Sequence, residues 1–207
     1  MKQTAQLIQK KIDELTAQRR VTVMLTGGRA AAQLYKEWRQ LKKFNEMINV
    51  TFYFGDERCV EPDNIESNYG LVMRTLFPSG IGNGCTIQRM HAENDDIEDA
   101  AVQYAALLPD SIDILLLGVG EDGHIASLFP NSWQLHEQIR LCLPIIGPKF
   151  PRKRLTITPA VIKNAKSTYI LVQGMEKIKI VEQAKLLPVD VNRLPVQMVK
   201  KPIWCYN

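Results

Sequence analysis

Cysteine and histidine are scarce in this sequence, which limits the metal and redox chemistry available to it. The chain of 207 residues has only four cysteines and three histidines. The cysteines are widely spaced, at Cys59, Cys85, Cys142 and Cys205. None forms a C-x-x-C pair or stands at a zinc-binding spacing from a histidine, so the pattern excludes a disulfide framework and the common zinc sites. We expect these thiols to be reduced and chemically inert.

Long apolar runs and a strong charge excess are also missing. No apolar run approaches the ~20 residues that cross a bilayer, and the polar segment 1–20 has no apolar signal core. The formal net charge is only +4, and basic residues are not interleaved with aromatic ones as in nucleic-acid-binding surfaces. We therefore expect a cytoplasmic protein that binds neither membrane nor nucleic acid. The mild positive charge is consistent with a small anionic substrate.

The sequence pattern is that of a globular α/β protein. Hydrophobic residues make up 45% of the chain and charged residues 23%, which is too apolar for disorder. Short apolar runs alternate with amphipathic stretches. We expect strands at 21–25, 50–54, 85–90, 112–117, 154–156, 167–172 and 203–206, and helices at 3–18, 30–41, 69–76, 97–108, from 159 onward, and at 175–187. This alternation predicts one domain over 1–207, with a three-layer Rossmann-like fold, a mostly parallel sheet and helices on both faces.

Three loops follow predicted strands and carry most of the chemically capable residues. They lie at 26–29, 55–62 and 118–124. In an open parallel sheet, ligands bind beyond the carboxyl ends of the strands. The sequence therefore predicts that these loops converge on one site.

The loop at 118–124 reads Gly-Val-Gly-Glu-Asp-Gly-His and follows the most apolar predicted strand. Its glycines formally match the G-x-G-x-x-G dinucleotide motif, but Glu121 and Asp122 would place carboxylates where a pyrophosphate must lie. We reject that interpretation. A neutral imidazole accepts a proton from water near pH 7, and a neighbouring carboxylate fixes its tautomer and stabilises the cation. We predict His124 as a general base with Asp122 as its partner; the alternative is a packed or solvated loop histidine.

The other two loops offer groups that suit a phosphorylated sugar. Arg58 is predicted to bind a phosphate through its planar fork, and Asp56 to bond sugar hydroxyls or to orient another side chain. Gly27 and Gly28 open a predicted helix, where free backbone N–H groups attract anions. The alternatives are a solvated salt-bridge cluster for the first loop and an ordinary turn for the second.

Further cations stand near these loops. Arg29 and Lys177 lie close to two predicted helix starts. Arg154 ends a basic stretch at 149–154, and we expect its side chain to reach the site. A long cationic side chain usually keeps its charged end in water, so the alternative for each is a solvated surface position.

Together these segments resemble the 6-phosphogluconolactonase family. The matching segments are FGDERCV at 54–60 with Asp63 and SNY at 67–69, LLGVGEDGHIASLFP at 116–130, PK at 148–149 with RLTIT at 154–158, and GMEK at 174–177. The resemblance runs in order from Val21 to Tyr206. Asn68, in the first segment, is expected to contact the substrate. The related glucosamine-6-phosphate deaminases share a similar D-G-H loop, but they usually carry a different tail and an aromatic residue where Arg58 stands.

The resemblance implies an activity and a role for several residues. It implies hydrolysis of 6-phospho-D-glucono-1,5-lactone to 6-phosphogluconate in the pentose phosphate pathway, with no redox cofactor and no required metal. By analogy, His124 activates water, Arg58 and Lys177 bind the phosphate, and Gly27 and Gly28 match the family's first glycine loop. We expect the phosphorylated lactone as the partner of a monomeric chain.

The sequence departs from the family just after the first glycine loop. Where the family usually has small hydroxyl residues and a proline, this chain has Arg29-Ala30-Ala31. Arg29 is predicted to compensate as a phosphate ligand, to alter the preferred substrate, or to indicate reduced activity. Two other functions stay open: a sugar-phosphate isomerase or deaminase of the same superfamily, with Asp56 as its base, and a diverged non-catalytic sugar-phosphate-binding protein.

Overall fold

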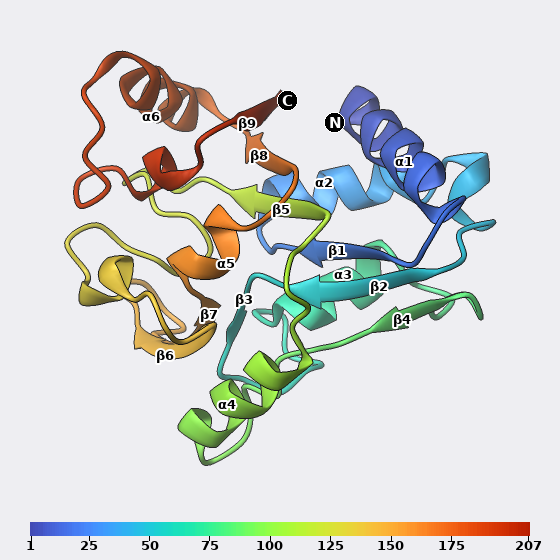
Figure 1. The fold of residues 1–207 in the computed structure, drawn as a ribbon, viewed down its shortest axis with the longest axis horizontal. Coiled ribbons are helices and arrows are strands. Elements are labelled where there is room, and N and C mark those ends of the chain that lie inside the picture. Colours follow the sequence, from blue (N-terminus) through green and yellow to red (C-terminus); the bar gives the residue numbers. More distant parts are fainter.

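The computed structural model describes all residues, 1–207, and its centre is a parallel sheet of six strands (Figure 1). The strands stand in the order β4-β2-β1-β5-β8-β9. Their bounds are Val21–Leu25 for β1, Val50–Phe54 for β2, Cys85–Ile87 for β4, Ile114–Gly118 for β5, Thr168–Val172 for β8 and Pro202–Tyr206 for β9. Every neighbouring pair is parallel. The predicted Rossmann-like α/β class is therefore confirmed.

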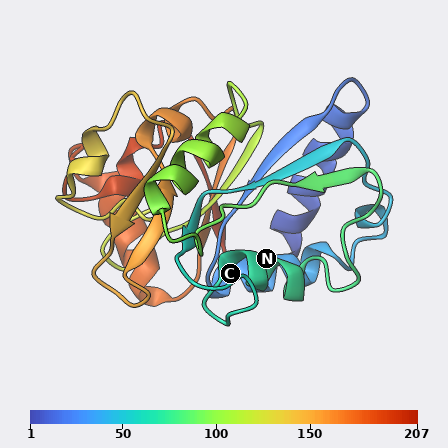
Figure 2. The same ribbon diagram turned by 90° about the horizontal axis from the view of Figure 1, so that it is seen from below.

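Helices cover both faces of this sheet. Their bounds are Lys2–Thr16 for α1, Arg29–Trp38 for α2, Asn68–Thr75 for α3, Ile97–Leu107 for α4, Pro159–Lys163 for α5 and Met175–Leu186 for α6. Figure 2 shows α2 and α3 on one side of the sheet and α4 on the other. Strands β2 and β8 are buried along their whole length, and β5 is buried up to its terminal Gly118, as the nearly continuous apolar run at 112–117 predicts. None of the helices has the length and apolar character that a membrane crossing requires.

A second sheet, antiparallel and three-stranded, is not predicted by the sequence pattern. It contains β3 (Asp56–Arg58), β7 (Lys153–Ile157) and β6 (Cys142–Ile146) in the order β3-β7-β6. The short polar segment β3 was expected to be loop, and it becomes a strand because it pairs with the distant β7. This pairing sets Arg58 opposite Arg154 and Asp56 opposite Thr156.

An ionic network around one buried carboxylate fixes the amino-terminal end of the six-stranded sheet. Asp113 immediately precedes β5, and its side chain is only 2% exposed. Its carboxylate accepts hydrogen bonds from Arg19 at 2.7 and 2.8 Å, from Lys166 at 3.0 Å and from the backbone N–H of Thr22 at 3.0 Å. Burial by itself raises the pKa of a carboxyl group, but these donors hold the pKa of Asp113 well below its usual range.

Candidate active site

A cleft lies where the chain connections of the parallel sheet change direction, between β1 and β5. From this central pair the chain builds β2 and β4 on one side and β8 and β9 on the other. Such a switch point leaves a crevice at the carboxyl ends of the strands. The cleft has a volume of about 190 Å³ and is lined by Thr26, Gly27, Gly28, Asp56, Arg58, Asn68, Gly118, Val119, Gly120, Glu121, His124, Ala126, Lys149, Arg154 and Lys177. The three post-strand loops therefore converge as predicted.

His124 stands on the wall of the cleft with Asp122 behind it. The Nδ1 atom of His124 lies 2.5 Å from Oδ1 of Asp122, which also accepts a hydrogen bond from the His124 backbone N–H. Burial alone would raise the pKa of Asp122, but its hydrogen bond and charge interaction with His124 lower that pKa to about 2. An ionised carboxylate can only accept, so Nδ1 carries the proton of the neutral ring. The basic atom left for a molecule in the cleft is Nε2.

Glycine at position 120 is a steric requirement of this pair. A Cβ atom there would lie closer than 3.0 Å to the imidazole of His124 and to Oδ1 of Asp122. On its other side, the imidazole contacts the ring of Phe129, with a centroid separation of 4.7 Å. The imidazole is therefore held by a carboxylate, an aromatic ring and the backbone of Gly120.

A second polar cluster surrounds the buried carboxylate of Asp56. Oδ2 of Asp56 accepts a hydrogen bond from the Ser127 hydroxyl at 2.7 Å, and Oδ1 accepts one from the Asn68 amide at 3.1 Å. Asn68 also donates to the backbone carbonyl of Asp56. A Cβ at Gly27 would collide with the Asn68 amide, so the first glycine loop is shaped to admit it. Asp56 and Asn68 are thus fixed in the cleft wall, as the sequence predicted for their position.

Glu57 is a structural residue that sequence reasoning did not assign. Its carboxylate accepts hydrogen bonds from the backbone N–H groups of Arg58, Asn68 and Tyr69 and from the Ser67 hydroxyl. Burial raises the pKa of Glu57, although the three backbone donors oppose that shift. Its bonds join β3 to the start of α3, which places Asn68 and Arg58 at the cleft. In the sequence, the only indication of this role was the position of Glu57 between Asp56 and Arg58, the two residues that were assigned to the site.

Arg58 and Lys177, the two predicted phosphate ligands, both line the cleft. Arg58 ends β3 and donates from Nη1 to the backbone carbonyl of Glu66 at 2.6 Å, while its buried Nε has no acceptor. Lys177 lies in the first turn of α6. Burial lowers the pKa of Lys177, while the charge of Glu121 acts in the opposite direction. Arg58 also forms an ion pair with Glu66 at 3.7 Å, whereas the Lys177 ammonium forms no ion pair or hydrogen bond within the protein. The unpartnered Nε of Arg58 and the Lys177 ammonium are the groups left for an anion in the cleft.

Arg154 lines the cleft, but its donors are largely occupied by the protein. Its Nε donates to the carbonyl of Pro151 at 2.8 Å and its Nη2 to the carbonyl of Lys149 at 3.0 Å. Its guanidinium also lies 5.5 Å from the ring centroid of Phe129. These contacts hold the loop that carries Lys149, whose side chain lines the cleft and was not assigned to the site from the sequence.

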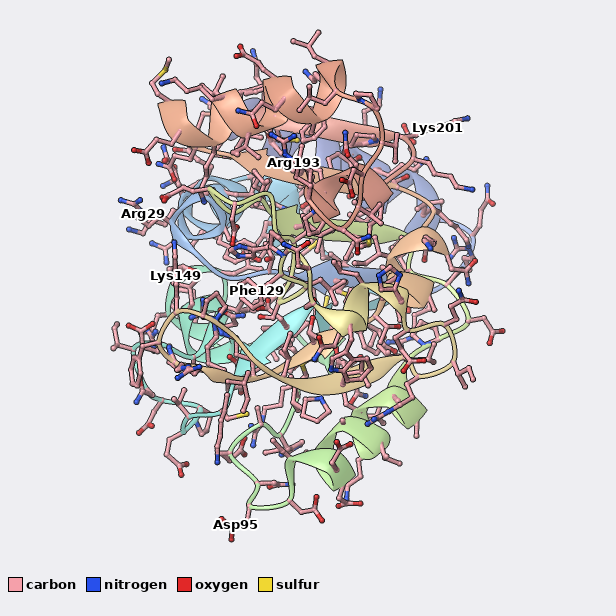
Figure 3. All side chains as sticks on the ribbon, turned by 90° about the vertical axis from the view of Figure 1, so that its left-hand side faces the viewer. Arg29, Asp95, Phe129, Lys149, Arg193 and Lys201 are labelled. Carbon is pink, nitrogen blue, oxygen red and sulfur yellow. The ribbon has the colours of Figure 1, made fainter.

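Arg29 lies outside the cleft. It is the first residue of α2, its side chain is exposed, and it borders a neighbouring groove together with Gly28, Arg58 and Asn68. Figure 3 shows the side of the molecule on which Arg29 and Lys149 lie. Of the residues predicted for the site, Arg29 therefore borders the cleft without lining it, and its charge still lowers the pKa of Lys177 after the larger effect of burial.

These features define a class of protein. A doubly wound α/β fold carries, at its switch point, a small cleft with a histidine–carboxylate pair on one wall and several cations around it. Such a site suits proton transfer on a small anionic substrate.

The family described as glucosamine-6-phosphate isomerases/6-phosphogluconolactonase matches residues 1–204, and the chain belongs to this family. The chain is 32% identical over 190 residues to a 6-phosphogluconolactonase of Pseudomonas aeruginosa, which covers 88% of this chain and 79% of that protein. It is 31% identical over 173 residues to a 6-phosphogluconolactonase of Treponema pallidum, and the match covers 79% of this chain and 71% of that protein. The crystal structure of a 6-phosphogluconolactonase from Shewanella baltica OS155 superimposes with a TM-score of 0.85 at 26% identity, covering 99% of this chain and 91% of that one.

Proposed function

We propose that the protein hydrolyses 6-phospho-D-glucono-1,5-lactone to 6-phosphogluconate, as a lactonase of the pentose phosphate pathway. The observation that carries the proposal is the His124–Asp122 pair on the wall of a cation-lined cleft. The names of the relatives support the same reaction. We further propose that residues 1–207 act as one catalytic domain, because the lining of the cleft extends from Thr26 to Lys177, and that the domain acts as a monomer.

The phosphate binds, in this proposal, at the end of the cleft formed by the first glycine loop. The backbone N–H groups of Gly27 and Gly28 donate to no acceptor within the protein. They stand at the start of α2, where a helix N-terminus favours negative charge. Arg58 and Lys177 supply the formal charges that neutralise the phosphate.

His124 then acts on water rather than on the lactone itself. Neutral His124 removes a proton through Nε2 as the water oxygen forms a bond to the lactone carbonyl carbon. The tetrahedral intermediate collapses by breaking the bond to the ring oxygen, and the imidazolium returns the proton to that oxygen. Asp122 stabilises the imidazolium while it exists. The product acid loses its proton to solvent, so one proton is released for each lactone opened.

The remaining groups orient the sugar and the loops. The buried carboxylate of Asp56, held by Ser127 and Asn68, presents a fixed edge to the sugar hydroxyls. Arg154 acts mainly by holding the loop of Lys149, since two of its nitrogens already donate to backbone carbonyls.

The test is a pH-stat assay on freshly generated 6-phosphogluconolactone, corrected for spontaneous hydrolysis. A general base contributes about 10²–10⁴-fold to the rate, so His124→Ala should lower kcat by that factor. Binding of inorganic phosphate should change little, because the proposed phosphate ligands are untouched. A variant with near-normal turnover would remove His124 from the mechanism.

The two alternative functions make different demands on the cleft. A deaminase would use Asp56 as its base, whereas here each of its carboxylate oxygens accepts one hydrogen bond from the protein and keeps a lone pair for the sugar hydroxyls. A binding protein would have no need for the His124–Asp122 pair. Release of ammonia from an amino-sugar phosphate would favour the first alternative, and tight ligand binding without turnover the second.

A further inference from the structure

Glu121 is a carboxylate in a cleft that otherwise gathers cations. It lines the cleft together with Lys149 and Lys177. The other carboxylate of the lining, Asp56, is 5% exposed and held by two hydrogen bonds. Glu121 is about half exposed, and its side chain accepts no hydrogen bond in the structure. Its carboxylate is therefore free to respond when a charged ligand enters.

The partners of Glu121 are the lysines that an incoming anion requires. Oε2 of Glu121 lies 4.0 Å from Nζ of Lys149. Lys177 also experiences its charge: burial lowers the pKa of Lys177, and among the charges that oppose this shift Glu121 comes first. Lys149 extends from the loop before β7 and forms the ion pair with Glu121. Lys177 extends from the start of α6, lines the same cleft and experiences the Glu121 charge without an ion-pair contact.

We propose that Glu121 is an internal competitor for the phosphate: it neutralises Lys149 and Lys177 in the empty cleft, weakens anion binding and favours release of the product. A phosphate monoester carries about −1.5 to −2 charges at pH 7, so it must displace Glu121 from the lysines and then remain close to it. Ring opening adds a carboxylate to the ligand, so the product is repelled more strongly than the lactone. The identity of the anion rests on the proposed function.

The size of the effect follows from the exposure of the pair. Exposed ion pairs are typically worth less than ~1 kcal/mol, and here the charge of one carboxylate acts on Lys149 at 4.0 Å and, from further away, on Lys177. We therefore expect Glu121→Gln to tighten binding of inorganic phosphate about fivefold, and binding of 6-phosphogluconate, which has the extra carboxylate, about tenfold. The substrate KM should fall as well, and inhibition by product should become stronger.

The test measures the Kd of inorganic phosphate and of 6-phosphogluconate by calorimetry on the full chain. Glu182→Gln is the matched control, because it removes the same charge from an exposed position on α6 outside the cleft. The control should leave both constants within about twofold of the wild type. The tightening by Glu121→Gln should shrink as salt is raised, since screening weakens exposed charge interactions.

Three results would overturn the inference. They are an unchanged Kd in Glu121→Gln, weaker binding in that variant, or equal tightening in Glu182→Gln. Neither ligand needs to be turned over in this experiment. If the wild type fails to hydrolyse the lactone while Glu121→Gln still tightens phosphate binding, the proposed function is wrong and the role of Glu121 stands.

Discussion

Replacing Gly120 by alanine tests whether the position of the imidazole controls the rate. The new methyl group would lie closer than 3.0 Å to the ring of His124 and to the Asp122 carboxylate. Position 120 does not have the positive φ of Gly123, so alanine introduces no backbone strain there. The substitution therefore acts on the histidine–carboxylate pair rather than on the fold.

The magnitude follows from the displacement that the methyl group forces. Carbon atoms in ordinary contact stand ~3.5–4.0 Å apart. The new methyl carbon would lie 2.3 Å from Cε1 of His124, so the imidazole must retreat by more than ~1 Å. A misplacement of ~1 Å costs about 10²-fold in rate, which corresponds to about 2.7 kcal/mol of activation free energy. The phosphate ligands do not move, so KM should change by less than about threefold.

The assay is the pH-stat hydrolysis of 6-phosphogluconolactone, with thermal unfolding measured in parallel. Gly82→Ala is the control, because a methyl group there meets no atom within 4 Å. Both variants should unfold within a few degrees of the wild type, and only Gly120→Ala should lose turnover. If Gly120→Ala kept kcat within threefold of the wild type, the position of the imidazole would not govern the rate, and the mechanism would need another base.

Two further predictions concern residues outside the cleft. Asp113→Asn should destabilise the protein by about 2 kcal/mol near pH 7, because hydrogen bonds to charged groups are worth about that much. Since the folded-state pKa of Asp113 is depressed, its contribution is present above the unfolded pKa of about 3.9 and is lost as the pH falls through the folded value. Urea unfolding should therefore show a difference in the free energy of unfolding between wild type and variant that becomes smaller below about pH 4. A difference that did not change with pH would contradict this account. Arg29→Ala should change the KM for the lactone less than about threefold, because its exposed side chain does not line the cleft, and a tenfold rise would restore Arg29 as a phosphate ligand.

The altered first glycine loop has a structural explanation that the sequence did not provide. Gly27 and Gly28 border the cleft, but the chain turns into α2 at residue 29, and the Arg29 side chain points into solvent. The backbone N–H groups of the two glycines are unaffected by this exchange, because they belong to the turn itself.

The sequence by itself determined the parallel sheet and the loops of the site. Apolar runs such as Val50–Phe54 and the one ending at Gly118 predict buried strands because a strand covered on both faces needs no polar side. His124 and Asp122 are two residues apart, so their pairing is a local property of one loop. Apolar runs and pairs of residues close in sequence depend only on a short stretch of chain, so they can be recognised from the sequence alone.

The tertiary structure alone decided which groups share the cleft. Asp56 and Ser127 meet although they are 71 residues apart, and β3 exists only because it pairs with β7. The same packing brought Lys149 into the cleft and left Arg29 outside it. The physical reason is that a side chain's partners across the fold depend on the register of distant strands and on the course of the loops. No spacing along the sequence encodes these directly.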